Sequence, residues 1–306
     1  LVNSLNNNLT DNRAEGNVIG LKIETGSDNN NLTKNIARVN DFGIDVRGRN
    51  NRVVNNTVTL NQDRGISVTS DDNYIAKNIV EDGSTGTGIR VSAANDNEII
   101  NNKAKRNSIG IRLTGSSQNN IFANNTVRDG IRVSGGFSSV FRNDTTSSVS
   151  VISGFTPEFE NLDISTVAGF PSSGTTLSFR ADDVSLEGNQ SLPTAPEGYT
   201  DIGKSFEAEG LFPSSVIDVK VHYEDSDVSG VTEESLSLWR YNGSWSEVSG
   251  STVDTAKNEV SAEINSFSVF APLGISSDVA SCRDITAPGE YRLTKNLTDR
   301  PEQSCI

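Results

Sequence analysis

The sequence predicts an all-β protein: a right-handed parallel β-helix of about seven coils, each of ~22 residues, followed by an antiparallel β-sandwich. Two observations support this prediction. A short glycine-containing motif recurs at nearly constant spacing over the first half of the chain, and alternating apolar and polar residues between turn signals fill the second half. An apolar content of 34% and a charged content of 22% are typical of a folded chain.

The recurring motif is a small residue followed by the triplet apolar-x-apolar. Counted from Leu21, the copies are spaced by 23, 22, 23, 22, 20 and 18 residues. A second, asparagine-rich phase lies between them, as in NRVVNNTV from Asn51 and NYIAKNIV from Asn73. The copies are Gly20-Leu21-Lys22-Ile23, Gly43-Ile44-Asp45-Val46, Gly65-Ile66-Ser67-Val68, Gly88-Ile89-Arg90-Val91, Gly110-Ile111-Arg112-Leu113, Gly130-Ile131-Arg132-Val133 and Ser148-Val149-Ser150-Val151.

This repeat favours a β-solenoid. Each triplet places two apolar side chains on one face of a short strand, and stacked coils bury that face together. Glycine and asparagine tolerate the left-handed conformations that tight corners need, and asparagines stacked at ~4.8 Å can form amide ladders. A leucine-rich repeat has a similar period, but it needs a leucine framework that residues 1–152 lack.

The G-I-x-V triplet together with N-x-I-x-N-N-x-I resembles the NosD-like repeats, also called carbohydrate-binding and sugar-hydrolase repeats. The resemblance covers residues 3–152. It implies a right-handed parallel β-helix of the kind found in archaeal and bacterial surface and secreted proteins.

Charge divides the chain near residue 152. Residues 1–152 contain 17 Lys and Arg against 15 Asp and Glu, whereas residues 153–280 contain 5 against 21. We therefore predict a β-helix over 1–152, an acidic β-sandwich over 153–275, and a linker with the start of a second β-helix over 276–306. Within the sandwich, Asn242-Gly243 predicts a tight hairpin.

The C-terminal segment SCRDITAPGEYRLTKNLTDRPEQSCI resembles the opening of another β-helix. This resemblance implies a disulfide between Cys282 and Cys305, the chain's two cysteines, in an oxidising compartment. Two free buried thiols are the alternative. Since the chain begins and ends within repeat patterns, we expect it to be a piece of a longer protein.

The middle residue of each triplet should point away from the core. Three consecutive coils place Arg90, Arg112 and Arg132 there, at a predicted spacing of ~4.8 Å. Arginine makes bidentate contacts with carboxylates and sulfates, so these residues are candidates for binding an acidic polysaccharide. The alternative is a solvated stripe, or one that faces the acidic sandwich of a neighbouring copy.

Metal-binding candidates are few. His222 is the single histidine and methionine is absent, which disfavours a transition-metal site. We expect His222 to be a strand residue with one nitrogen hydrogen-bonded. Asp225, Asp227 and Glu233 supply carboxylates that calcium prefers, although the sequence favours a solvated acidic loop as their explanation. No other cofactor is predicted.

Two further residue sets have structural and functional interpretations. Asp63, Asp71 and Asp72 crowd the central coils, where a glycosidase would need paired carboxylates, but turn positions also favour aspartate. Among the N-x-[ST] triplets, Asn189 and Asn242 lie on predicted loops and are candidates for glycosylation.

The acidic second half disfavours a nucleic-acid partner, and no apolar run approaches the ~18 residues of a membrane span. We expect a non-catalytic, extracellular or cell-surface protein with a structural or adhesive role, whose partners are polysaccharides or other surface proteins. The alternative is a polysaccharide lyase or glycoside hydrolase that acts in a groove of the β-helix.

Overall fold

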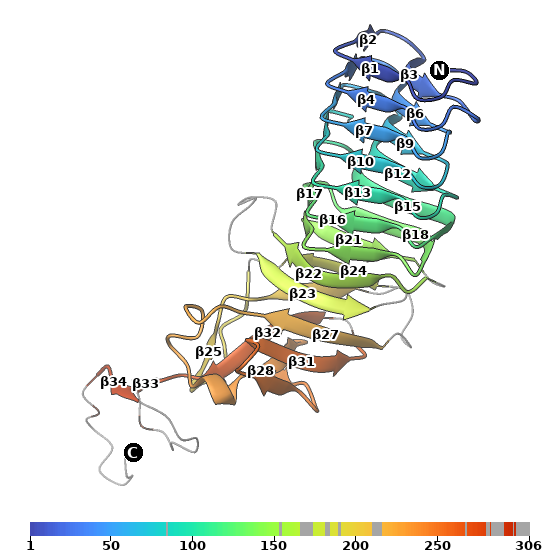
Figure 1. The fold of residues 1–306 in the computed structure, drawn as a ribbon. Coiled ribbons are helices and arrows are strands. Elements are labelled where there is room, and N and C mark those ends of the chain that lie inside the picture. The colour runs from blue at the N-terminus through green and yellow to red at the C-terminus, as the bar shows by residue number, and fades with distance from the viewer. Residues whose placement is uncertain are drawn as a thin grey trace.

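A computed structural model describes residues 1–306 except 84, 153–154, 166–173, 181–183, 189–190, 210–215, 267, 280–281, 283–290, 296 and 298–306. The fold is an elongated β-structure with β1 (Asn8–Thr10) near one end and β34 (Arg292–Leu293) near the other (Figure 1). Seven coils of a parallel β-solenoid form the N-terminal half, as the repeat predicts. Within the described ranges, the helical structure is one 3₁₀ turn, η2 (Glu233–Ser235).

Each coil contributes three strands, and equivalent strands pair in parallel from coil to coil. The first strip contains β1 (Asn8–Thr10), β4 (Asn31–Thr33), β7 (Arg52–Val54), β10 (Tyr74–Ala76), β13 (Glu98–Ile100), β16 (Ile121–Ala123) and β19 (Val140–Arg142). The second contains β2 (Arg13–Glu15), β5 (Ile36–Arg38), β8 (Thr57–Thr59), β11 (Ile79–Glu81), β14 (Lys103–Lys105), β17 (Thr126–Val127) and β20 (Thr145–Thr146). The third contains β3 (Ile19–Ile23), β6 (Phe42–Val46), β9 (Arg64–Val68), β12 (Thr87–Ser92), β15 (Ile109–Gln118), β18 (Ile131–Phe137) and β21 (Ser148–Val151).

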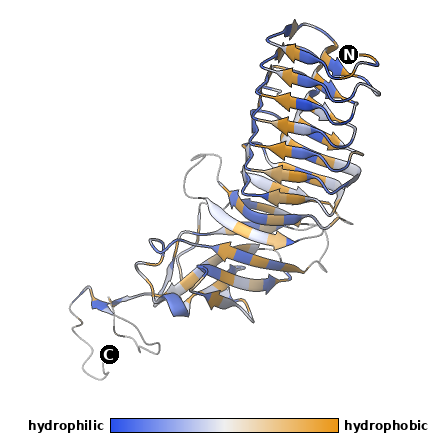
Figure 2. Cartoon of the chain, in the orientation of Figure 1, coloured by the Kyte–Doolittle hydropathy of each residue, from blue (hydrophilic) through white to orange (hydrophobic). Residues whose placement is uncertain are grey.

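Hydrophobic and hydrophilic residues both occur along these short strands (Figure 2). Side chains alternate between the two faces of a strand, and the apolar ones are buried inside the solenoid. The third strip shows the repeat directly: Ile44 pairs with Ile66, and Ile66 with Ile89, each fully buried. Because every coil offers the same apolar face to the next, the core is one continuous column along the solenoid axis.

Most glycines of the motif have a different role from the one that the sequence suggested, whereas Gly130 has the expected left-handed φ of 84°. Gly43, Gly65, Gly88 and Gly110 are not among the residues with positive φ. Instead, a Cβ on Gly65 would lie 2.6 Å from the Gly88 carbonyl oxygen and 2.2 Å from Val80 Cγ1. Equivalent close approaches occur at the other three. The glycines therefore stack because consecutive coils leave no space for a side chain.

Asparagine does form the corners and ladders that were predicted. At most corners a residue with left-handed φ is followed by a buried side chain, as in the exposed Asn101 (φ 57°) and the buried Asn102. Asn102 Oδ1 accepts hydrogen bonds from the backbone N–H and the Nδ2 of Asn78, both at 3.0 Å. Its own Nδ2 donates to the Ile75 carbonyl at 2.8 Å. The ladder thus pairs polar groups that the corner buries.

The C-terminal half contains two antiparallel sheets that continue the sheets of the solenoid. One adds β22 (Glu158–Ile164), β23 (Thr175–Arg180), β27 (Ile217–His222), β31 (Glu259–Ile264) and β30 (Thr252–Asp254). The other adds β24 (Val184–Gly188), β26 (Phe206–Glu209), β32 (Ser268–Ile275), β28 (Ser237–Tyr241), β29 (Trp245–Glu247) and β25 (Tyr199–Asp201). Beyond them, β33 (Asp278–Val279) pairs with β34 (Arg292–Leu293).

This continuity differs from the expected separate sandwich. At the junction, β22 pairs in parallel with β19 and β20 and antiparallel with β23, while β21 pairs antiparallel with β24. One cluster of buried apolar residues also runs from Ile23 to Phe270. The charge change near residue 152 therefore marks a change of surface, and not a break in the sheets or the core. The expected hairpin at Asn242-Gly243 joins β28 to β29.

Candidate functional site

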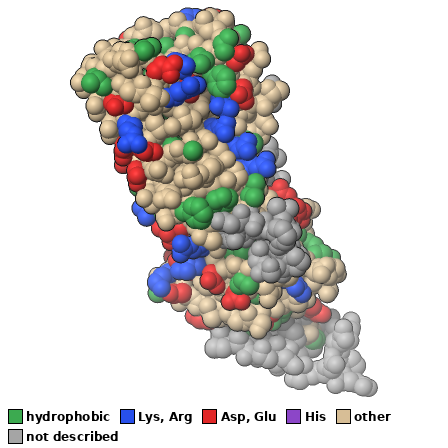
Figure 3. All heavy atoms as spheres, turned by 90° about the vertical axis from the view of Figure 1, so that its right-hand side faces the viewer, with side chains coloured by type: hydrophobic (Ala, Val, Ile, Leu, Met, Phe, Trp, Pro, Cys, Tyr) green, Lys and Arg blue, Asp and Glu red, His purple; other side chains and the backbone are tan. Residues whose placement is uncertain are grey.

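The three repeat arginines lie side by side on the outer face of the third strip. Arg90 on β12 is in register with Arg112 on β15, and Arg112 is in register with Arg132 on β18. Arg90 and Arg112 are half-buried and Arg132 is exposed. We call these three residues the arginine column. Lys and Arg side chains follow one another down this side of the solenoid in Figure 3.

The arginine column lacks the carboxylate partners that other solenoid arginines have. Within the described part of the chain, none of its members forms an ion pair, and the buried Nε atoms of Arg90 and Arg112 have no hydrogen-bond partner. By contrast, ion pairs are formed by Arg13, Arg38, Arg47, Arg49, Arg64, Arg106 and Arg142. The arginine column is therefore a line of positive charges without ion-pair partners among the described residues.

Burial and neighbouring cations both act on this charge. Burial lowers the pKa of Arg90, and the nearby positive charges of Arg64 and Arg112 lower it further, while Asp63 opposes them. Like charges in register destabilise adjacent strands. A bound anion would relieve that repulsion, since a guanidinium binds a carboxylate or sulfate through paired N–H groups.

The same outward position is neutral or negative one and two coils earlier. Asp45 is buried, and its Oδ2 accepts a hydrogen bond from Arg47 Nε at 2.8 Å. Ser67, which pairs with Arg90, is fully buried, and its Oγ has no partner among the described residues. At this position of the repeat, buried polar atoms without a hydrogen-bond partner thus occur in three consecutive coils, at Ser67, Arg90 and Arg112.

The calcium candidates each have another partner. Asp225 accepts a hydrogen bond from Asn258 at 2.7 Å, and Asp227 forms an ion pair with Lys204 at 3.2 Å. Glu233 accepts a hydrogen bond from the Tyr223 hydroxyl at 2.8 Å. Among the residues with a described position, no group of three His, Cys, Asp or Glu side chains is placed to hold a metal ion.

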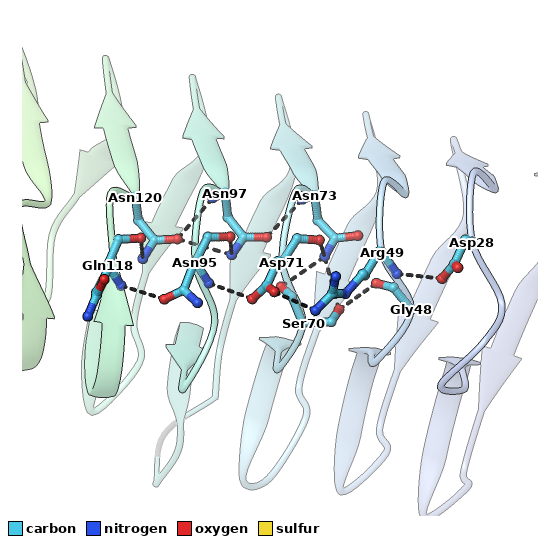
Figure 4. Close-up of polar contacts among 10 residues, drawn as sticks. All are labelled: Asp28, Gly48, Arg49, Ser70, Asp71, Asn73, Asn95, Asn97, Gln118 and Asn120. Carbon is cyan, nitrogen blue, oxygen red and sulfur yellow. Dashed lines mark hydrogen bonds and ion pairs between the residues drawn. The ribbon is translucent and has the colours of Figure 1, made fainter.

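The central aspartates lie at corners of the coils. Asp72 has a φ of 61°, and Asp71 accepts hydrogen bonds from Arg49 Nη2 at 2.8 Å and from the Asn95 N–H at 2.9 Å. Figure 4 shows Asp71 in this outer row of contacts, beside the inner ladder formed by Asn73, Asn97 and Asn120. Asp63 pairs with its neighbour Arg64 at 3.5 Å. These contacts stabilise the corners of the solenoid.

The remaining predicted sites lie partly outside the described residues. Asn242 is on the exposed turn between β28 and β29, while Asn189 falls outside the described ranges. Cys282 is described and Cys305 is not, so the predicted disulfide between them and the second β-helix stay predictions.

Sequence reasoning missed one arrangement around His222. Both of its ring nitrogens have partners: Nε2 lies 2.8 Å from Ser178 Oγ, and Nδ1 lies 3.5 Å from Glu259 Oε1. The expectation of one hydrogen-bonded nitrogen is confirmed at Nε2, and the Nδ1 contact is an ion pair only when the ring is protonated. Alternation places Ser178, His222 and Glu259 on one face of their strands, but the sequence does not reveal that those strands are neighbours.

Comparisons with known proteins bear on the fold and the family. Residues 1–156 match the family described as periplasmic copper-binding protein (NosD). The Dettilon tailspike protein (gp208) is a solved structure similar to this chain, with 13% identity, a TM-score of 0.38, and coverage of 84% of this chain and 69% of that one. No curated protein matches the chain.

The copper in the family description does not fit the residues present. The chain has one histidine, two cysteines and no methionine, and its described residues contain no metal-binding cluster. No helix in the described part has the length and apolar character that a membrane span needs. The seven-coil solenoid and the match over 156 of 306 residues nevertheless agree, and the chain belongs to the NosD family.

Proposed function

We propose that this protein is a structural or adhesive protein of the cell surface or extracellular space that binds acidic polysaccharide along the arginine column. One observation supports this most strongly. Arg90, Arg112 and Arg132 are in register and lack the carboxylate partners found for most other solenoid arginines. A chain of carboxylates or sulfates running along the solenoid axis would meet one guanidinium per coil, at a spacing of ~4.8 Å.

The shape of the protein supports the same function. A solenoid presents a long, straight face whose outward positions repeat in every coil, which suits an extended polymer better than a compact ligand. The family description as periplasmic supports a location outside the cytoplasm. The aspartates that a lyase or hydrolase would use are engaged at corners, as at Asp71, so binding is favoured over cleavage of the polymer.

Affinity measurements with defined polymers test this function. We expect polygalacturonate to bind the protein and neutral dextran not to bind. The double substitution Arg90→Gln and Arg112→Gln should weaken binding of polygalacturonate at least ~10-fold, because charge-assisted hydrogen bonds contribute about 1.5–3 kcal/mol each. Binding should also weaken as salt rises.

The double substitution Arg49→Gln and Arg106→Gln is the matched control, because it also removes two positive charges, from arginines already paired with Asp71 and with Glu81 and Asp82. Its affinity for polygalacturonate should stay within ~2-fold of the unsubstituted protein. Equal losses in the control and the arginine-column variant would show attraction by overall charge and would contradict a defined site. Absence of any binding to polygalacturonate would contradict the proposal itself.

A further inference from the structure

Three outward-facing residues of the C-terminal sheet form a line across neighbouring strands. Ser178 lies on β23, His222 on β27 and Glu259 on β31, strands that pair in this order. Ser178 Oγ is 2.8 Å from His222 Nε2, and His222 Nδ1 is 3.5 Å from Glu259 Oε1. Along this line the groups are, in order, a hydroxyl, an imidazole and a carboxylate. This is the arrangement found around an activated serine nucleophile.

Hydrogen bonds around Ser178 direct its proton toward the histidine. A bulge in β22 places Asn161 at a φ of 50°, and the Asn161 N–H donates to Ser178 Oγ at 2.9 Å. Since Oγ accepts there, its own proton can be donated to His222 Nε2 at 2.8 Å, the shorter of its two acceptor contacts; the other is Asn161 Oδ1 at 3.5 Å. The Nδ1 proton then faces Glu259, which holds the ring in the tautomer that a general base needs.

Electrostatics keep His222 ready to accept a proton. Burial lowers the pKa of His222, so the ring is neutral at pH 7. Glu259 opposes this shift and Lys220 adds to it. Lys220 lies directly opposite Ser178 in the β23–β27 pair, and its ammonium is 3.4 Å from Glu259. It is the cation nearest in register to the hydroxyl.

The three residues line one hollow in the surface, and His222 also borders a second. One, of about 410 Å³, is lined by Ser178, His222, Glu259, Arg180 and Lys220 among others. The second, of about 380 Å³, shares His222 with the first and is lined by Lys204 and Lys257. The histidine side chain is 20% exposed and the glutamate 15% exposed, so a ligand can reach them. The acyl group of an ester would bind in one hollow and its alcohol in the other, and basic side chains line both.

We propose that Ser178, His222 and Glu259 form a catalytic triad that hydrolyses O-acyl esters. Ser178 Oγ attacks the ester carbonyl carbon, an Oγ–C bond forms, and the hydroxyl proton passes to His222 Nε2. The bond from that carbon to the alcohol oxygen then breaks, and the alcohol leaves with the proton from Nε2. Water, deprotonated by His222, releases the acid and restores the serine. Glu259 is a positioning residue, and Lys220 stabilises the negative charge on the carbonyl oxygen. This activity goes beyond polysaccharide binding and does not depend on it.

Labelling of the unsubstituted chain by a fluorophosphonate probe tests the triad without relying on a variant that must fold. Peptide mapping should find the phosphonyl group on Ser178, and p-nitrophenyl acetate should be hydrolysed above the buffer rate. Ser178→Ala should abolish labelling and lower the rate at least ~10-fold, with an unchanged circular dichroism spectrum. Ser246→Ala, at an exposed serine of β29, is the matched control and should retain both.

Glu259→Gln tests the positioning role separately. It should lower kcat about 10-fold with little change in KM, and it should move the acid limb of the pH–rate profile to lower pH. The reason is that the carboxylate raises the pKa of His222. Glu259 and Lys220 are the charged groups that act on the pKa of the ring, and Lys204, Glu224 and Lys257 line the hollow that the ring borders. The strands β23 and β22 present the neutral Ser178 and Asn161. Labelling spread equally over several serines, or a rate equal to buffer, would overturn the proposal.

Discussion

The solenoid and the antiparallel C-terminal half share the same two sheets, but the polar residues that they bury are of different types. Asparagines such as Asn78 and Asn102 are buried throughout the solenoid, where each corner turns the chain inside the stack. In the described part of the C-terminal half, the buried polar residues are hydroxyl-bearing: Ser165, Thr175, Ser205, Thr232 and Ser237. Antiparallel strands turn back through surface hairpins, so their corners need no buried amide. Parallel coiling is therefore what requires asparagine.

The two halves are nevertheless joined by one core. Phe122 stacks on Phe141 at 4.3 Å between ring centroids, Phe141 on Phe159 at 4.8 Å, and Phe159 on Phe179 at 4.5 Å. This row starts in the solenoid and ends on β23, in the antiparallel half. The halves differ in charge and in the residues at their corners, but their interiors are continuous. A large loss of packing in one half should therefore destabilise the other.

Gly65→Val should have the largest effect on stability. The new side chain would collide with the Gly88 carbonyl oxygen and with Val80, both inside the stack, where nothing can move without separating two coils. We expect a loss of about 4 kcal/mol or more in the free energy of unfolding, a size typical of severe overpacking. Urea denaturation followed by circular dichroism measures it.

Gly230→Val is the matched control from the other half. A Cβ there would have no atom within 4 Å, and the φ of Gly230 is not in the left-handed region. Its free energy of unfolding should change by less than ~0.5 kcal/mol, as for ordinary surface substitutions. Similar losses in both variants would contradict the assignment of the solenoid glycines to close coil contact.

The arginine column was predictable because the repeat is in register: equal spacing from Leu21 fixes which residues of successive coils are neighbours, and Arg90, Arg112 and Arg132 follow. The role of Gly65 was not, since a recurring glycine is compatible with either a left-handed turn or a close approach. Ser178 and Glu259 could not be linked to His222, because β23, β27 and β31 are neighbours in space but not in sequence. The continuity across residue 152 was also missed, because charge reports on the surface and not on the core.

Asn102→Ala should have the second largest effect. It removes the acceptor for two Asn78 donors and the donor to the Ile75 carbonyl, all in the buried ladder. Unsatisfied buried groups cost about 1–3 kcal/mol each, and we expect a total loss of ~3 kcal/mol from urea denaturation. Asn101→Gly, at the adjacent exposed corner with φ 57°, keeps the left-handed conformation and should cost less than ~0.5 kcal/mol. A large loss of stability for Asn101→Gly would show that the corner residue, and not the buried ladder, contributes most of the stability at this position.

The last rung of this ladder, at the junction of the halves, is an aspartate. Asp144 Oδ1 accepts hydrogen bonds from the N–H and Nδ2 of Asn125 at 2.7 and 2.9 Å, while its buried Oδ2 has no partner in the described structure. In the preceding rungs the equivalent position is an amide nitrogen that donates to a carbonyl one coil earlier, as Asn125 does to Ile99. Burial raises the pKa of Asp144 to about 7, so the carboxyl is protonated at acidic pH. It then carries an O–H donor where the preceding rungs carry an amide N–H donor.

Asp144→Asn should have the smallest effect of the three, with the opposite sign. Because the folded-state pKa of about 7 exceeds the ordinary value of 3.8, the folded protein binds more protons between these values, and stability falls as pH rises through that window. One pKa unit corresponds to about 1.4 kcal/mol, which sets a ceiling of ~4 kcal/mol; we expect a gain of about 2 kcal/mol at pH 8. The gain should disappear near pH 4, where urea denaturation of both proteins should coincide. A gain of equal size at both pH values would show that the new amide acts through packing, and the ladder would then end without a titrating rung.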